Sequence, residues 1–142
     1  MKNLILAIAL IATPLLSFAD TVDYWHVSIN DQVIARFNSA TKNPALTLKK
    51  SDYKEGDKIS IRYGDDTPCS KCMFSIMIMN DKDRRLRANK TTEFWGPISF
   101  DLFDLIHVGE QNETSYYDFK YWESSGDGGR PQMINVLRLT IK

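Results

Sequence analysis

Apolar and polar residues alternate with a period of two along much of the chain, which is the pattern of β-strands with one buried face. Clear examples are residues 58–63, 73–79, 117–122 and 135–141. Clusters of Asn, Asp, Gly and Pro separate most of these stretches and mark turns. The pattern predicts about seven or eight short strands.

Residues 24–37 read as a β-hairpin with a turn near residues 30–32. A three-residue turn would put three apolar residues of each strand on one face, namely Trp25, Val27, Ile29, Val33, Ala35 and Phe37. The same register sets His26 opposite Arg36 on the outer face. A two-residue turn is the alternative, and it would change the register.

The chain shows no convincing amphipathic helix, and only residues 104–107 suggest a short helical turn. Many short strands separated by turns are typical of a sandwich of two antiparallel sheets. We therefore predict an all-β, antiparallel β-sandwich that resembles immunoglobulin-like domains in its architecture. No repeat, low-complexity segment or linker interrupts residues 20–142, so we expect them to form a single domain.

Residues 1–19 have the features of a secretory signal peptide. Lys2 supplies a positive charge, an apolar run follows, and Ser17 and Ala19 provide the small residues that a signal peptidase reads. The apolar run is too short and interrupted to span a bilayer, and no later stretch approaches the necessary length. We expect an exported mature chain, periplasmic or secreted, that begins near Asp20 and has no transmembrane segment.

The charges of the chain nearly balance, with 18 basic and 18 acidic side chains. Removal of residues 1–19 takes away Lys2 and leaves 17 basic residues against 18 acidic ones. A nucleic-acid-binding face would be strongly basic, and the densest basic cluster, residues 82–87, is interrupted by Asp83. Composition therefore argues against a nucleic acid and indicates no other electrostatic partner. For an exported sandwich without visible catalytic residues, we expect a protein or an extracytoplasmic surface component as the partner.

Both cysteines lie in the segment TPCSKCMFSIMIM, residues 67–79. In an exported protein such a pair is expected to oxidise, so we predict a disulfide between Cys69 and Cys72. Pro68 would stiffen the same turn by fixing its own backbone angle. The strand that follows is apolar on both faces, so we expect a loop, a helical turn or a partner chain to cover its methionine side.

Two alternatives to a structural disulfide are a redox centre and a copper site. A redox centre needs an activated cysteine, usually at a helix N-terminus, and the pair here leads into a strand instead. Thiolates and thioethers select Cu(I), and Cys69, Cys72, Met73 and Met77 supply both types of ligand. The first alternative function is therefore a periplasmic thiol- or copper-handling protein with Cu(I) as its cofactor, whereas the disulfide requires no cofactor.

Aromatic residues supply another candidate site. In residues 116–122 (YYDFKYW), strand alternation puts Tyr116 and Trp122 on one face. The other three rings, Tyr117, Phe119 and Tyr121, lie on the opposite face. Exposed Trp and Tyr bury much area at little entropic cost, so they suit ligand or partner binding. With Trp95, these two residues form the ligand-binding set of a second alternative, a carbohydrate-binding module.

No catalytic constellation is visible. The two histidines, His26 and His107, belong to no metal-binding or nucleophile motif. We therefore expect an exported, non-enzymatic binding or interaction protein.

Overall fold

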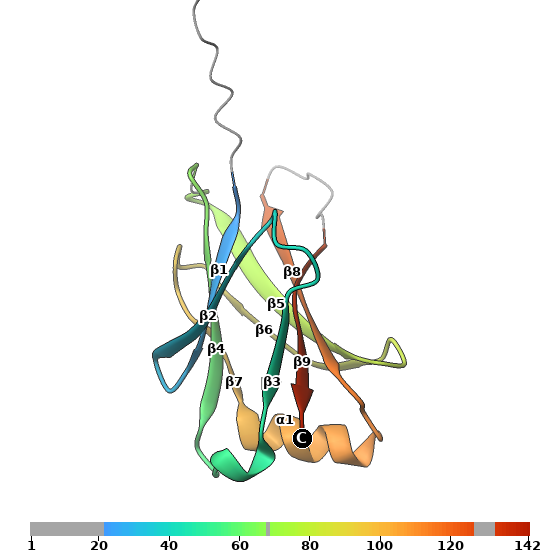
Figure 1. The fold of residues 1–142 in the computed structure, drawn as a ribbon. Helices are drawn as coiled ribbons and strands as arrows, with labels where there is room; N and C mark the ends of the chain where they lie inside the picture. Colours follow the sequence, from blue (N-terminus) through green and yellow to red (C-terminus); the bar gives the residue numbers. More distant parts are fainter. Residues whose placement is uncertain (1–21, 68, 127–132) are drawn as a thin grey trace, which may run out of the picture.

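The computed structural model describes residues 22–67, 69–126 and 133–142. Two β-sheets pack face to face, and a short helix lies across one end of the resulting sandwich (Figure 1). The predicted signal peptide, residues 1–19, lies outside the described residues and remains a prediction, and so does the expected role of Pro68.

The nine strands of the described residues divide into a four-stranded and a five-stranded sheet. In spatial order the first sheet contains β2 (Gln32–Asn38), β1 (Tyr24–Ile29), β4 (Lys58–Gly64) and β7 (Ile98–Asp101). The second contains β3 (Ala45–Leu48), β9 (Ile134–Ile141), β8 (Tyr117–Ser125), β5 (Cys72–Asn80) and β6 (Arg85–Thr91). A 3-10 turn, η1 (Lys50–Asp52), follows β3. The sandwich is confirmed, with more strands than the seven or eight expected.

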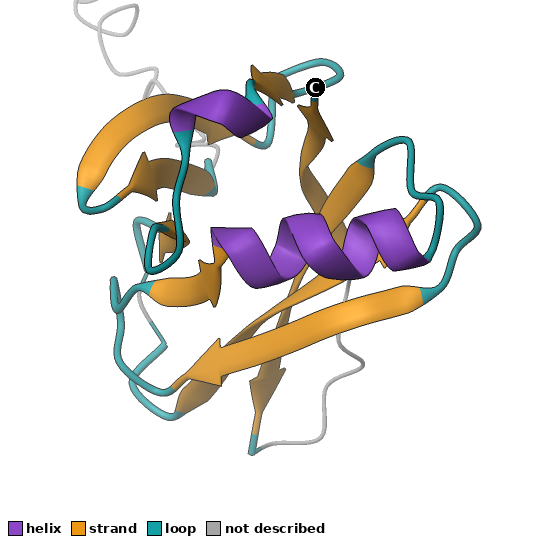
Figure 2. Cartoon of the chain, turned by 90° about the horizontal axis from the view of Figure 1, so that it is seen from below, coloured by secondary structure: helices purple, strands orange, loops and turns teal. Residues whose placement is uncertain are grey.

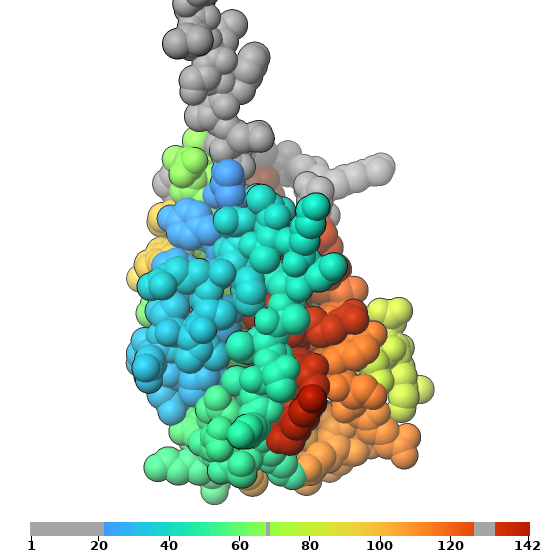
Figure 3. Space-filling view, viewed as in Figure 1, coloured from blue at the N-terminus to red at the C-terminus, as the bar shows by residue number. Residues whose placement is uncertain are grey.

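One edge of the larger sheet departs from the expected antiparallel arrangement. Strand β3 pairs with β9 in parallel, with Leu46 beside Leu139, whereas the other described pairings are antiparallel. The chain leaves β2 in one sheet and enters β3 in the other, so β3 lies at the surface between the β1–β2 hairpin and β9 (Figure 3). The prediction of a purely antiparallel sandwich is therefore wrong at this edge.

The β1–β2 hairpin has the two-residue turn. Asn30 and Asp31 have φ of 48° and 67°, the left-handed conformation that such tight turns require at both positions. The predicted pairing of His26 with Arg36 is nevertheless confirmed. A β-bulge after Val27 absorbs the extra residue, so only the pairs next to the turn differ from the three-residue register.

The core lies between the two sheets. Strand alternation predicts its members correctly, because Ile59, Ile61 and Tyr63 of β4 are all buried. The same holds for the rings of β8, where Tyr117, Phe119 and Tyr121 face the core. Trp25 is 1% exposed and packs on Tyr63 and Tyr121, with ring centroids 5.9 Å away in each case.

The expectation of only a short helical turn is wrong. Helix α1 (Leu102–Gln111) has ten residues and closes the end of the sandwich, as the view from below shows (Figure 2). Its first turn is capped by the Asp101 carboxylate, which accepts a hydrogen bond of 2.8 Å from the Asp104 backbone N–H. The carboxylate of Asp104 in turn pairs with Arg87 through two hydrogen bonds of 2.7 and 2.8 Å. No helix of the described residues has the length and apolar character needed to cross a bilayer.

Candidate functional site

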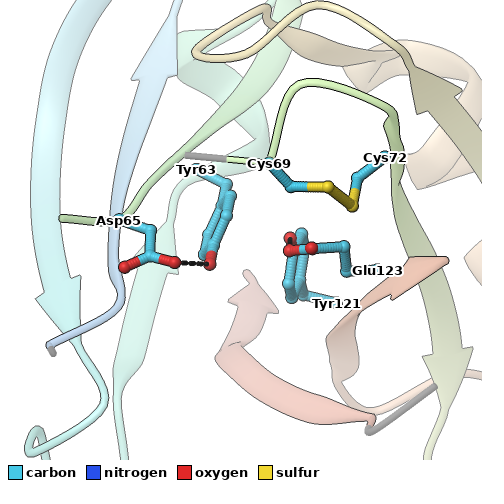
Figure 4. Close-up of a disulfide and its surroundings, with 6 residues drawn as sticks. All are labelled: Tyr63, Asp65, Cys69, Cys72, Tyr121 and Glu123. Carbon is cyan, nitrogen blue, oxygen red and sulfur yellow. Dashed lines mark hydrogen bonds between the residues drawn. A yellow bond between two sulfur atoms is a disulfide. The ribbon is translucent and has the colours of Figure 1, made fainter. Parts of the chain in front are cut away.

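The predicted cysteine pair lies at the end of the sandwich opposite α1, in the loop between β4 and β5 (Figures 1 and 4). The sulfur atoms of Cys69 and Cys72 are at the distance of a disulfide bond, and their Cα atoms are 5.5 Å apart. Cys72 opens β5 and is buried, whereas Cys69 is half-buried. The bridge thus closes a loop at the start of the most apolar strand.

Two stacked tyrosines lie next to this disulfide (Figure 4). The rings of Tyr63 and Tyr121 have centroids 4.4 Å apart and planes inclined by 23°. The Tyr63 hydroxyl donates a hydrogen bond of 2.9 Å to Asp23, and the Tyr121 hydroxyl donates one of 2.9 Å to Glu123. Burial, with these carboxylates as a further cause, raises the pKa of both tyrosines far above its usual value, so both hydroxyls stay protonated donors.

Glu123 also lies beside the cysteine pair, although the sequence pattern gave no reason to place it there. A carboxylate oxygen of Glu123 and the sulfur atoms of Cys69 and Cys72 all lie within 4.8 Å of one another. The proximity results from the pairing of β5 with β8, which sets Cys72 opposite Ser125. Glu123 follows the cysteines by about fifty residues, so no local motif could have indicated it.

The methionines of the copper hypothesis lie elsewhere. Successive side chains of a strand point to opposite faces, so Met73 and Met77 lie on the outer face of β5 and Cys72 on the inner one. The structure therefore brings Glu123, and not these thioethers, to the cysteine pair. The outer face is half-buried at each methionine, and the main contacts of α1 are with β4, β6 and β7.

The three aromatic candidates do not form one site. Trp122 lies on the outer side of β8, and Tyr116 directly precedes that strand. Trp95 belongs to the β6–β7 loop and packs on the four-stranded sheet. The Arg138 guanidinium lies 3.7 Å above the Tyr116 ring, so one face of that ring is covered. A pocket of about 430 Å³ lies near this pair. The cation at this pocket is Arg138, and its charge is already neutralised by Asp118, to which it donates two hydrogen bonds of 2.8 and 2.9 Å.

Trp95 is part of a second cluster, which we call the aromatic platform and define as Tyr24, His26 and Trp95. The ring centroids of Trp95 lie 5.5 Å from Tyr24 and 4.8 Å from His26, and those of Tyr24 and His26 are 6.0 Å apart. All three side chains are half-buried. Because Tyr24 and His26 alternate with buried residues of β1, the platform lies on the outer face of the four-stranded sheet.

Local structure holds the platform in place. Gly64 pairs with Tyr24, and a Cβ atom there would overlap the Tyr24 ring, so only glycine lets the ring lie against the sheet. Trp95 has φ of 62°, a conformation that is costly for a bulky residue and is often found at functional sites. The Arg62 guanidinium fixes this loop by donating a hydrogen bond of 2.7 Å to the Trp95 carbonyl oxygen.

Positive charge flanks the platform. The sheet register sets His26 between Arg36 of β2 and Arg62 of β4. Burial, and secondarily the charge of Arg36, lowers the pKa of His26, so its imidazole is neutral at pH 7. Among the described residues, neither guanidinium has a carboxylate within ion-pair distance. The platform thus combines ring faces with two cations that can accept an anionic partner.

No protein-family model matches the chain, and a search of curated proteins finds no match either.

Proposed function

We propose that the protein is an exported, non-enzymatic binding protein that recognises an acidic saccharide of an extracytoplasmic surface through the aromatic platform. The proposal includes removal of the signal peptide, residues 1–19, and an immunoglobulin-like arrangement of the sandwich. A two-sheet sandwich presents broad outer faces on a rigid core, which suits recognition.

The observation that carries the proposal is the pairing of the platform with unneutralised arginines. Tyr and Trp rings offer flat apolar faces to a ligand and bury them at little entropic cost. A guanidinium recognises a carboxylate or sulfate through two parallel hydrogen bonds. A sugar ring that bears an acidic group could stack on Trp95 and accept hydrogen bonds from Arg36 at the same time.

Comparison with the other candidates favours the platform. The Tyr116 ring is partly covered by Arg138, and Arg138 is paired with Asp118. A ligand at that surface would have to break the ion pair before it gained a cation. Arg36 is exposed and needs no such rearrangement.

Affinity electrophoresis of the mature protein tests the proposal, with polygalacturonate in the gel as the acidic probe and dextran as the neutral one. We expect retardation by polygalacturonate alone, with weakening as salt screens the guanidinium charges. Arg36→Gln should weaken binding about ten- to hundredfold, because a hydrogen bond to a charged group contributes about 1.5–3 kcal/mol. Trp95→Gly should also weaken it, and glycine tolerates the positive φ of this position.

Tyr116→Ala and Trp122→Ala are the matched controls, because both rings lie on the other sheet. Binding that survives both platform variants but fails in these controls would move the site to β8. Equal retardation by dextran and polygalacturonate, or by neither, would reject the proposed ligand class.

A further inference from the structure

The disulfide end of the sandwich contains a second site, independent of the aromatic platform. We propose that reduction of the Cys69–Cys72 bridge creates a Zn(II) site whose protein ligands are the two thiolates and the carboxylate of Glu123.

The three donor atoms lie close enough together in the oxidised protein for small movements to build a zinc site. The three donor atoms already lie within 4.8 Å of one another. A tetrahedral zinc ion with Zn–S bonds of about 2.3 Å holds its two sulfurs about 3.8 Å apart. A disulfide holds them about 2 Å apart, so reduction followed by small side-chain rotations opens the necessary space. The Cα separation of 5.5 Å need not change.

The donor set selects the metal. Thiolates together with a carboxylate suit Zn(II), whereas Cu(I) favours an all-sulfur set. The thioethers of Met73 and Met77 lie on the opposite face of β5 and cannot complete such a set. Three protein ligands leave a fourth position for water or another ligand. Cys69 and Glu123 are half-buried, so that position is open to solvent.

The hydroxyl of Tyr121 would hold the proposed ligand Glu123 in position without itself binding the metal. Tyr121 donates its hydroxyl to one oxygen of Glu123, which leaves the other oxygen available for the metal. Stacking on Tyr63 and edge contact with Trp25 fix the Tyr121 ring. Two thiolates and Glu123 bring three negative charges together, and a divalent cation would offset most of that repulsion.

The chemistry balances with an external dithiol as reductant. The dithiol gives two electrons and two protons to the bridge, becomes a disulfide itself, and leaves Cys69 and Cys72 as thiols. Zinc then displaces both thiol protons. In an oxidising compartment the site would fill only where a dithiol donor reduces this bridge, so metal binding would depend on the local redox state.

Metal titration of the reduced, full mature chain tests this inference. A phosphine reductant is applied and removed without oxygen, and the protein is titrated with Co(II) and then with Zn(II) against a chromophoric chelator. We expect one metal per chain, a thiolate-to-cobalt charge-transfer band, and displacement of cobalt by zinc. Glu123→Gln should weaken zinc binding at least about tenfold, and Tyr121→Phe should weaken it by a smaller factor. Met73→Leu and Met77→Leu should leave the affinity unchanged.

Three results would overturn the inference: no binding that competes with the chelator, equal binding by the oxidised protein, or an unchanged affinity in Glu123→Gln. Near-ultraviolet circular dichroism of each variant shows whether the packing of the aromatic core is retained. If Glu123→Gln fails to fold, Tyr121→Phe decides, because it keeps all three ligands and removes only the hydrogen bond that positions one of them.

Discussion

Replacement of Gly109 by alanine should destabilise the protein, although the same change stabilises most helices. Gly109 lies in α1 directly against the side chain of Tyr117, a residue that is only 4% exposed. A Cβ atom at Gly109 would lie 2.6 Å from Tyr117 Cζ and closer still to its hydroxyl oxygen. That hydroxyl donates a buried hydrogen bond of 3.1 Å to the Leu105 carbonyl oxygen.

The opposing contributions can be compared. In a helix interior without such a contact, Gly→Ala adds about 1 kcal/mol of stability. Overpacking of a core costs about 1–3 kcal/mol. Displacement of the Tyr117 hydroxyl from its buried acceptor costs about 1–3 kcal/mol more. Together these contributions should lower the free energy of unfolding by about 1–5 kcal/mol, with a central value of about 3 kcal/mol.

Urea unfolding of residues 20–142, followed by circular dichroism with the disulfide intact, measures this change. The midpoint should fall while the denaturant slope stays constant. Gly126→Ala is the control, because a Cβ atom there meets none of the described residues within 4 Å, and this change should alter the free energy of unfolding by less than about 0.5 kcal/mol. Tyr117→Phe in the Gly109→Ala background should recover part of the loss by removing the nearest atom. An increase in stability for Gly109→Ala would refute the packing of α1 on Tyr117.

Two further predictions concern the helix cap and the buried tyrosines. Asp101→Ala should lower the free energy of unfolding by about 1 kcal/mol and Asp101→Asn by much less, since asparagine keeps the capping acceptor; thermal unfolding measures both, and equal losses would contradict the cap. Burial raises the pKa of Tyr117 to about 12 and raises that of Tyr63 and Tyr121 further, so the unfolded chain releases these protons first. Stability should therefore fall as the pH rises from about 10 through 12. Phenolate absorbance of the folded protein measures the titration, and ionisation of all the tyrosines near pH 10 would contradict it.

Much of the fold follows from local patterns. Alternation identifies the inward residues of β4 and β8 because each strand buries one face. The β5–β6 hairpin follows from the turn after Asn80, whose side-chain amide oxygen accepts backbone hydrogen bonds from Lys82 and Arg84.

Helix α1 was harder to predict for a physical reason. Its first buried residue, Leu102, continues the alternation of β7 and therefore reads as strand. One of its buried positions is Gly109, which carries no side chain and so weakens the apolar stripe. The helix becomes clear only when Tyr117 is seen to occupy the space that this glycine leaves.

The candidate sites depend on long-range register. The disulfide could be predicted because its cysteines are close in sequence and have no other partners. The association of Glu123 with that bridge requires the β5–β8 pairing, and the association of Trp95 with Tyr24 requires the path of the β6–β7 loop. Neither follows from composition or local periodicity, since both join residues far apart in the chain.

The interior position of β9 has a consequence for how the molecule assembles. β9 follows every other described strand in the sequence, yet it lies between β3 and β8. Until β9 pairs with them, β3 and the edge of β8 that faces β9 have unpaired backbone groups. The partner of β3 follows it by about ninety residues in the sequence. Closing such a long loop is slow, and during this time the unpaired strand edges can associate with other chains. Chaperones that shield nascent strands should therefore raise the yield of folded protein more than they do for chains built from sequential hairpins.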